Sequence, residues 1–144
     1  MFHGPTMTAR IESVEEMMEL GAVAARAAEA GAVIGLVGDL GAGKTHWVKG
    51  FVAEMGCRAE VTSPTFGLVH EYRGGRLPVS HFDFYRLGSA EELVALGWDE
   101  YLEDGGVVVA EWADKFPSLM PPKTRWFYFT IGTDGVRILS DRPA

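Results

Sequence analysis

The chain has 144 residues, of which 47% are hydrophobic and 23% are charged, and this globular composition predicts a single domain over 1–144. Its net charge of −7 argues against a protein whose main task is to bind DNA or RNA, because such binding depends on cationic contacts to phosphates. The single cysteine, Cys57, excludes a disulfide within one chain, and no local pattern supports a nucleophilic role for it.

The first residues do not have the pattern of a targeting segment. Residues 1–7 lack the basic start and long apolar stretch of a signal peptide, and we expect them to be flexible, with Met7 as an alternative start of translation. The longest uncharged apolar run, 32–37, is too short to cross a bilayer. We therefore expect a cytoplasmic protein without a membrane partner.

Residues 13–31 are predicted to form the first helix. Ser13 and Glu16 have the spacing of a capping box, and Gly31 is a typical stop. Residues 32–37 follow as an apolar run without alternation, which is typical of a strand covered on both faces. The predicted apolar face of the helix consists of Val14, Met17, Met18, Val23 and Ala24.

The rest of the chain alternates between helical and β patterns. Turn residues such as Gly74 and Gly75 separate β-like runs, and Ser89 begins a capped helix. The order predicts an α/β fold. The expected elements are a helix over 44–56, a hairpin of 65–72 and 77–85, a helix over 89–102, a buried strand over 106–112, and a second hairpin of 125–132 and 136–140.

Residues 38–45, GDLGAGKT, match the pattern G-x-x-x-x-G-K-[ST], and we call them the glycine loop. The glycines let backbone N–H groups turn inward around a phosphate, and the following helix aims its positive dipole end at the same place. Lys44 can reach the outer phosphates, and the Thr45 hydroxyl can bind Mg²⁺. A tight strand–helix turn explains the glycines but not Lys44 and Thr45, and a Rossmann site has a different glycine spacing. The predicted nucleotide-binding residues of the loop are Asp39, Leu40, Gly41, Ala42, Gly43, Lys44 and Thr45.

The chain contains no asparagine and no glutamine. The guanine-reading motif N-K-x-D therefore cannot occur, and the glutamine that orients water in many GTPases is missing, which favours ATP. Glu111 follows a second buried strand, where such proteins place a carboxylate for the magnesium; the alternative is a simple cap of the strand end. Trp112 either stacks on a nucleotide or fills the edge of the core. The expected fold is a P-loop NTPase-like three-layer sandwich, with a mostly parallel central sheet extended by antiparallel strands.

Two further motifs allow alternative interpretations. In an alternating strand over 81–86, His81, Asp83 and Tyr85 share one face. That face either lines the nucleotide site, with Asp83 near the metal or the attacking water, or is simply solvated. Residues 62–66, TSPTF, lie where P-loop proteins often have a switch segment, although an ordinary turn explains them better.

The segments GDLGAGKT, SPTF, HFDFYR, EELVALGWDEYL and VVVAEW occur in one order, and in this the chain resembles the TsaE family, bacterial P-loop ATPases of tRNA threonylcarbamoyladenosine biosynthesis. The resemblance spans 11–112, and the tail beyond Lys115 is similar only in being β-rich. It implies slow ATP hydrolysis with Mg²⁺ that supports turnover of the TsaB–TsaD complex. That complex attaches the threonylcarbamoyl group, from a donor made by TsaC, so tRNA is a partner only indirectly.

The resemblance also implies roles for single residues, carried over motif by motif. Thr45 and Glu111 are expected to hold magnesium, and Trp112 is expected to lie beside the nucleotide. Asp83 is a candidate for positioning the metal or a water. The catalytic candidates are Lys44, Asp83 and Glu111, and the switch-like candidates are Ser63 and Thr65.

One position departs from the family pattern, and two other functions compete with the ATPase. The family usually has a second threonine after the glycine-loop threonine, where this chain has His46, so the motif does not fix the rate of ATP hydrolysis.

A small-molecule kinase is the main alternative to the ATPase, but it needs a lid with several arginines, and no insertion supplies one. The third possibility is a non-catalytic nucleotide sensor or a direct tRNA binder, and the acidic charge weighs against tRNA as the main ligand.

Overall fold

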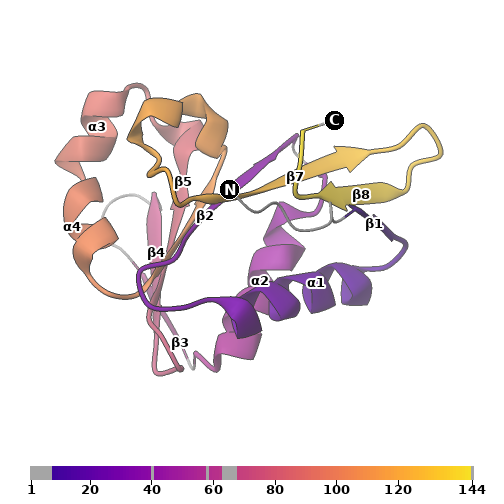
Figure 1. Cartoon of the computed structure of the whole chain (residues 1–144), viewed down its shortest axis with the longest axis horizontal. Helices are drawn as coiled ribbons and strands as arrows, with labels where there is room; N and C mark the ends of the chain where they lie inside the picture. Colours follow the sequence, from indigo (N-terminus) through magenta and orange to yellow (C-terminus); the bar gives the residue numbers. More distant parts are fainter. Residues whose placement is uncertain (1–7, 40, 58, 63–67, 144) are drawn as a thin grey trace.

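The computed structural model describes residues 8–39, 41–57, 59–62 and 68–143. In these residues, eight strands form one mixed sheet in the order β1-β8-β7-β2-β6-β5-β4-β3 (Figure 1). The strands are β1 (Thr8–Ile11), β2 (Val33–Gly38), β3 (Ala59–Thr62), β4 (Val69–Arg73), β5 (Val79–Asp83), β6 (Val107–Glu111), β7 (Arg125–Ile131) and β8 (Arg137–Ser140).

The centre of the sheet is parallel. β2 pairs in parallel with β6 and β7, and β6 pairs in parallel with β5. β8 and β1 extend one side by antiparallel pairing, and β4 and β3 extend the other. The predicted α/β class with a mostly parallel centre and antiparallel extensions is confirmed. The two outermost strands, β1 and β3, were not predicted from the sequence.

Helices cover both faces of the central strands. α1 (Val14–Ala27) and α2 (Lys44–Met55) pack against one face, and α3 (Ala90–Ala95) and α4 (Trp98–Glu103) pack against the other (Figure 1). Successive residues of β6 alternate between the two cores, since Val109 packs with α1 and α2 whereas Val108 packs with α3 and α4. This double cover explains why the central strands are apolar without alternation.

The first helix begins as predicted, and part of its predicted apolar face is buried. The Ser13 hydroxyl accepts a hydrogen bond from the Glu16 backbone N–H at 3.1 Å, which confirms Ser13 as the N-cap. The helix ends at Ala27 and not near Gly31. Val14 and Val23 are each 47% exposed, so their predicted place on the apolar face is wrong. Met17 and Ala24 of the predicted face are buried, and the small residues Ala22 and Ala25 join them where α1 and α2 pack closely.

Two other predicted elements are interrupted. The helix expected over 89–102 is split into α3 and α4 at Gly97, whose φ of +100° is incompatible with a continuous helix. The strand expected over 77–85 stops at Asp83, because the Asp83 carboxylate accepts a hydrogen bond from the Tyr85 backbone N–H at 3.0 Å and closes a 3₁₀ turn. Tyr85 therefore does not share a strand face with His81. Among the described residues, no helix has the length and apolar character to cross a membrane.

Candidate functional site

The glycine loop joins the end of β2 to the start of α2, at the carboxyl end of the parallel strands. Gly41 has a φ of +84° and Gly43, the N-cap of α2, has a φ of +106°. These values lie in the left-handed region, where residues with a Cβ are strained. A Cβ on Gly43 would also overlap with the end of the Met17 side chain. Both glycines are thus required by the backbone path, while Leu40 lies outside the described residues.

Lys44, the first residue of α2, is buried although it carries a charge. Its side chain is only 4% exposed. The ammonium donates a hydrogen bond to the Gly38 carbonyl, and it lies 4.0 Å from the centre of the Trp112 ring, within the range of a cation–π contact. Burial lowers the pKa of Lys44, and the nearby carboxylates, Glu111 first among them, oppose that change without overcoming it. The amino group is therefore held by neutral partners beside acidic groups.

Glu111 ends β6, beside β2 and β5. Its carboxylate oxygen Oε2 lies 2.6 Å from Nε2 of His81, and the two side chains are only 14% and 12% exposed. An ionised carboxylate can only accept hydrogen bonds, so Nε2–H of His81 is the donor. Glu111 is therefore more than the exposed cap of a strand end, since it is held on one side by a partly buried histidine.

Asp83 lies next to Glu111 in the sheet, and its carboxylate, like that of Glu111, acts on the charge of Lys44. The Cα atoms of the two residues are partners in the β5–β6 register. The Asp83 carboxylate caps the 3₁₀ turn through the Tyr85 N–H, and it lies 3.8 Å from Nε of Arg86. Asp83 is not among the described residues that line the cleft presented next. Its role toward metal or water stays a prediction.

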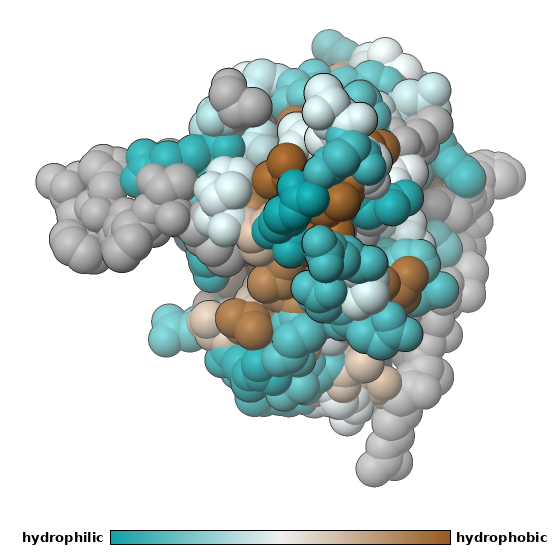
Figure 2. Space-filling model, turned by 90° about the vertical axis from the view of Figure 1, so that its right-hand side faces the viewer, coloured by the Kyte–Doolittle hydropathy of each residue, from teal (hydrophilic) through white to brown (hydrophobic). Residues whose placement is uncertain are grey.

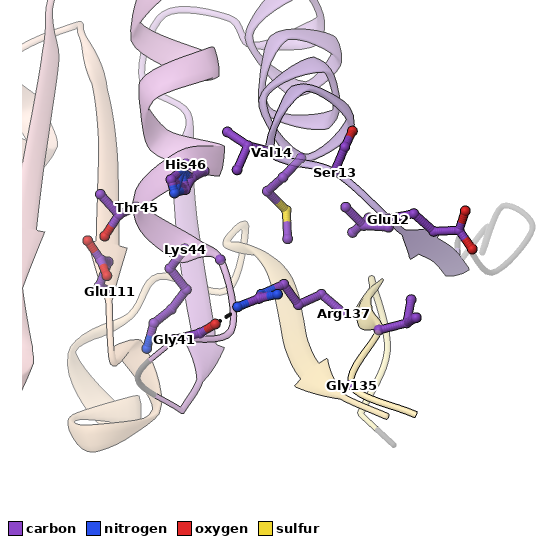
Figure 3. A pocket seen from close by; sticks show the side chains of 14 residues that line it. Glu12, Ser13, Val14, Gly41, Lys44, Thr45, His46, Glu111, Gly135 and Arg137 are labelled. Carbon is purple, nitrogen blue, oxygen red and sulfur yellow. Dashed lines mark hydrogen bonds between the residues drawn. The ribbon is translucent and has the colours of Figure 1, made fainter. Parts of the chain in front are cut away.

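Lys44, Thr45 and Glu111 line one cleft of about 740 Å³, within the size range of ligand pockets (Figure 3). In Figure 3 the Thr45 hydroxyl and the Glu111 carboxylate point toward the same part of this cleft. With Gly41 and Gly43, the cleft thus brings together five of the predicted site residues, from the glycine loop, the start of α2 and the end of β6. The further lining residues are Ile11, Glu12, Ser13, Val14 and Met17 from the end of β1 and the start of α1, Gly41, Gly43 and His46 from the loop and α2, and Gly135, Val136 and Arg137 from the β7–β8 hairpin.

The walls from α1 and the β7–β8 hairpin were not predicted. Arg137 is hydrogen-bonded to the glycine loop, since its Nε–H donates to the Gly41 carbonyl at 3.0 Å (Figure 3). Val14 lines the cleft and is also 47% exposed, so the apolar side chains of this wall extend to the protein surface. Figure 2, which views the side of the molecule carrying α1 and the hairpin, shows hydrophobic residues gathered at the centre of that face among hydrophilic ones. Nothing in the local sequence around Arg137 marks it, since it reaches the loop only through the sheet order.

Trp112 follows β6 in an unusual conformation. Its φ of +58° is the only positive value at a non-glycine position among the described residues. Its ring contacts both the Lys44 ammonium and the ring of Tyr85, whose centre is 4.9 Å away. Trp112 is absent from the described lining of the cleft, so its place beside a nucleotide stays a prediction.

Four other residues from the sequence analysis have simpler outcomes. His46 lines the cleft, and its Nδ1 is buried without a hydrogen-bond partner in the described part of the chain. The switch-like candidates Ser63 and Thr65 lie outside the described residues, as do residues 1–7. Cys57 has a thiol pKa that burial raises, which agrees with the absence of a nucleophilic role.

Comparison with known proteins decides the family. Residues 11–138 match the family model described as Threonylcarbamoyl adenosine biosynthesis protein TsaE. The chain belongs to the TsaE family. The match continues through β7 into β8, so the TsaE relationship extends beyond the residue range 11–112 on which the resemblance was based.

Relatives and a solved structure agree with this assignment. The chain is 39% identical to the tRNA threonylcarbamoyladenosine biosynthesis protein TsaE of Treponema pallidum, over 87% of this chain and 92% of that protein. It is 41% identical to the Bacillus subtilis protein of the same description, over 78% of this chain and 70% of that protein. The crystal structure of Bacillus subtilis YdiB superposes with a TM-score of 0.78 at 32% identity and covers 94% of this chain and 84% of that one. The family is thus one of tRNA threonylcarbamoyladenosine biosynthesis proteins.

Proposed function

We propose that this chain is a Mg²⁺-dependent ATPase with a P-loop NTPase-like three-layer fold, and that its hydrolysis of ATP serves the TsaB–TsaD complex in the cytoplasm. One observation carries the proposal: Lys44, Thr45 and Glu111 line a single cleft at the carboxyl ends of the neighbouring parallel strands β2 and β6. Open α/β sheets bind their ligands at that edge. TsaB and TsaD are the partners that the family resemblance implies, and tRNA is reached through them.

The donor set of the cleft fits magnesium. The Thr45 hydroxyl and the Glu111 carboxylate are hard oxygen ligands that lie near each other in the same cleft (Figure 3). Mg²⁺ usually takes one or two carboxylates together with phosphate oxygens and waters. When bound, it supplies electrostatic stabilisation of the charge that develops on the transferred phosphoryl group. Thr45 and Glu111 are therefore the residues that would hold it.

The loop and Lys44 bind and orient the phosphates. The left-handed backbone at Gly41 and Gly43 opens the start of α2, whose N–H groups and dipole attract an anion. Within the described residues, the Lys44 ammonium donates to a neutral carbonyl and contacts an aromatic ring, while nearby carboxylates act on it through their charge. Phosphate oxygens would add a direct anionic hydrogen-bond partner. Asp83, beside Glu111 in the register, stays our candidate for orienting the attacking water.

The wall beyond the loop suits the nucleoside end of ATP. Ile11, Val14 and Met17 supply apolar surface, and Arg137 supplies hydrogen-bond donors at the loop. Apolar walls with a few polar groups are typical of small-molecule pockets. We assign this wall to the base and ribose.

The test measures ATP hydrolysis with and without TsaB–TsaD for the parent, Lys44→Ala and Glu111→Ala. We expect slow turnover alone, stimulation by the partners, and no hydrolysis by either variant. Lys49→Ala is the matched control, because Lys49 lies exposed on the same helix, and its rates should equal those of the parent.

Three results would contradict the proposal. Fast turnover without partners would remove the need for TsaB–TsaD, because hydrolysis would then need no outside group. Transfer of phosphate from ATP to a nucleoside, sugar or acid by the isolated protein would establish the small-molecule kinase. Tight, steeply salt-dependent tRNA binding without partners would make the protein a direct tRNA binder.

A further inference from the structure

The hydrogen bond between His81 and Glu111 indicates a function for His81, a residue outside the glycine loop. We propose that His81 is a positioning residue for the magnesium site: its Nε2–H holds Oε2 of Glu111, so that Oε1 is presented to the cleft. This inference rests on the proposed function, because it assigns a partner to the carboxylate that would hold Mg²⁺.

The register of the sheet makes this contact specific. The Cα partner of His81 on β6 is Val109, so the imidazole reaches diagonally along the strand direction to Glu111, two residues further on. The separation of Nε2 and Oε2 is 2.6 Å, and both side chains are more than four-fifths buried. Water competes poorly for a hydrogen bond at such low exposure, so this bond restricts the carboxylate to one orientation.

The other ring nitrogen indicates which form of the imidazole is present. Nδ1 of His81 is buried and has no hydrogen-bond partner within the described residues. A buried lone pair without a partner is tolerated better than a buried N–H without one. The arrangement therefore places a ring proton on Nε2, where it is directed at Glu111.

Partners of this kind have measurable effects on metal affinity. Removing a hydrogen-bond partner of a metal ligand typically costs about 10- to 100-fold in metal affinity or activity. Because His81 does not line the cleft, its removal should leave the binding of nucleotide without metal unchanged. The expected effect is thus confined to the gain in affinity that Mg²⁺ gives to the nucleotide.

The experiment measures ADP affinity by calorimetry in EDTA and in saturating Mg²⁺ for the parent, His81→Leu and His81→Gln. We expect the Mg²⁺-dependent gain to fall about 10-fold or more in His81→Leu, with the EDTA affinity unchanged. His81→Gln should recover much of the gain, because its amide N–H can reach the position of Nε2–H. In a Glu111→Gln background, His81→Leu should have no further effect.

The outcomes separate this inference from the proposed function. A parent without any Mg²⁺-dependent gain would refute the proposed magnesium site itself. A normal gain in the parent and the same gain in His81→Leu would overturn only the role of His81, and so would an equal loss in Leu and Gln variants that are both folded. If His81→Leu does not fold, ¹⁵N NMR of the parent decides: a ring protonated at Nε2, with a slowly exchanging proton, supports the inference, and protonation at Nδ1 alone overturns it.

Discussion

Replacing Lys44 by methionine should abolish ADP binding but leave the ligand-free protein as stable as the parent or more stable. Lys44 is 4% exposed, and methionine fills nearly the same volume without a charge. The variant loses a hydrogen bond from a charged group to the Gly38 carbonyl, about 1.5–3 kcal/mol, and a cation–π contact to Trp112, about 2 kcal/mol. It also avoids burying an ammonium, which costs several kcal/mol. The opposing contributions are therefore of similar size.

The pKa of Lys44 decides the sign of the difference. Burial lowers this pKa from 10.5 in spite of the surrounding carboxylates, so the charged form is less favourable in the folded protein than in the unfolded chain. Methionine should therefore raise the free energy of unfolding by 0 to about 2 kcal/mol. Lys49→Met, at an exposed position of the same helix, removes the same charge and should change it by less than about 0.5 kcal/mol.

The advantage of methionine should depend on pH in one direction. Between the lowered pKa of folded Lys44 and 10.5, the unfolded parent binds more protons than the folded parent, so the parent gains stability as the pH rises. The methionine variant has no such group. The difference between the two proteins is therefore largest below the folded pKa and shrinks as the pH approaches 10.5. Parallel urea titrations at several pH values measure it. A loss of more than about 2 kcal/mol in the variant, or a difference independent of pH, would refute this reasoning.

Three further substitutions test the backbone that shapes the cleft. Ser13→Ala removes the hydrogen bond from the Glu16 N–H and should lower the free energy of unfolding by about 1 kcal/mol in urea titrations; an unchanged midpoint would mean that the cap contributes nothing. In Gly21→Ala the new methyl group overlaps with the Trp47 carbonyl oxygen, so we expect a loss of about 1–3 kcal/mol where helix propensity alone predicts a gain, and a raised midpoint would contradict the close packing of α1 on α2. Gly43→Ala forces a side chain into a φ of +106°, which should cost about 1–3 kcal/mol and abolish ADP binding in calorimetry; a folded variant that binds ADP like the parent would show that this conformation is not needed.

The parts of the site that sequence predicted are those that local chemistry specifies. The glycine loop is recognisable because left-handed backbone requires glycine, and because a lysine and a hydroxyl at a helix start suit a phosphate and its metal. Glu111 was recognisable because a carboxylate after a run of buried valines needs a partner. The Ser13 cap and the αL stop at Gly56 follow from equally local rules.

The parts that were missed depend on contacts between distant segments. The pairing of His81 with Glu111 needs the β5–β6 register, which no local pattern contains. Arg137 reaches the loop only because β8 joins the sheet next to β7, and β7 next to β2. β1 and β3 have four residues each and lie at the edges, so neither is long enough to show an alternating pattern. Tyr85 does not lie on its predicted strand face, because the hydrogen bond from its backbone N–H to the Asp83 carboxylate ends the strand at Asp83.

Features that disfavour folding gather around the site for which the function is proposed. Lys44 is a buried cation, Trp112 adopts a left-handed backbone at a cost of about 1–3 kcal/mol, and the buried Nδ1 atoms of His46 and His81 have no partner among the described residues. Trp47, whose indole N–H is also buried without a described partner, is the exception, since it belongs to the core between α1 and α2. Proteins tend to break local rules at functional sites, where strain or an unmet hydrogen bond is retained because a ligand or a reaction needs the group. Under the proposed function the cost at Lys44 has a reason, because phosphate oxygens would add a direct anionic partner to the carbonyl and the aromatic ring that the described part of the chain provides.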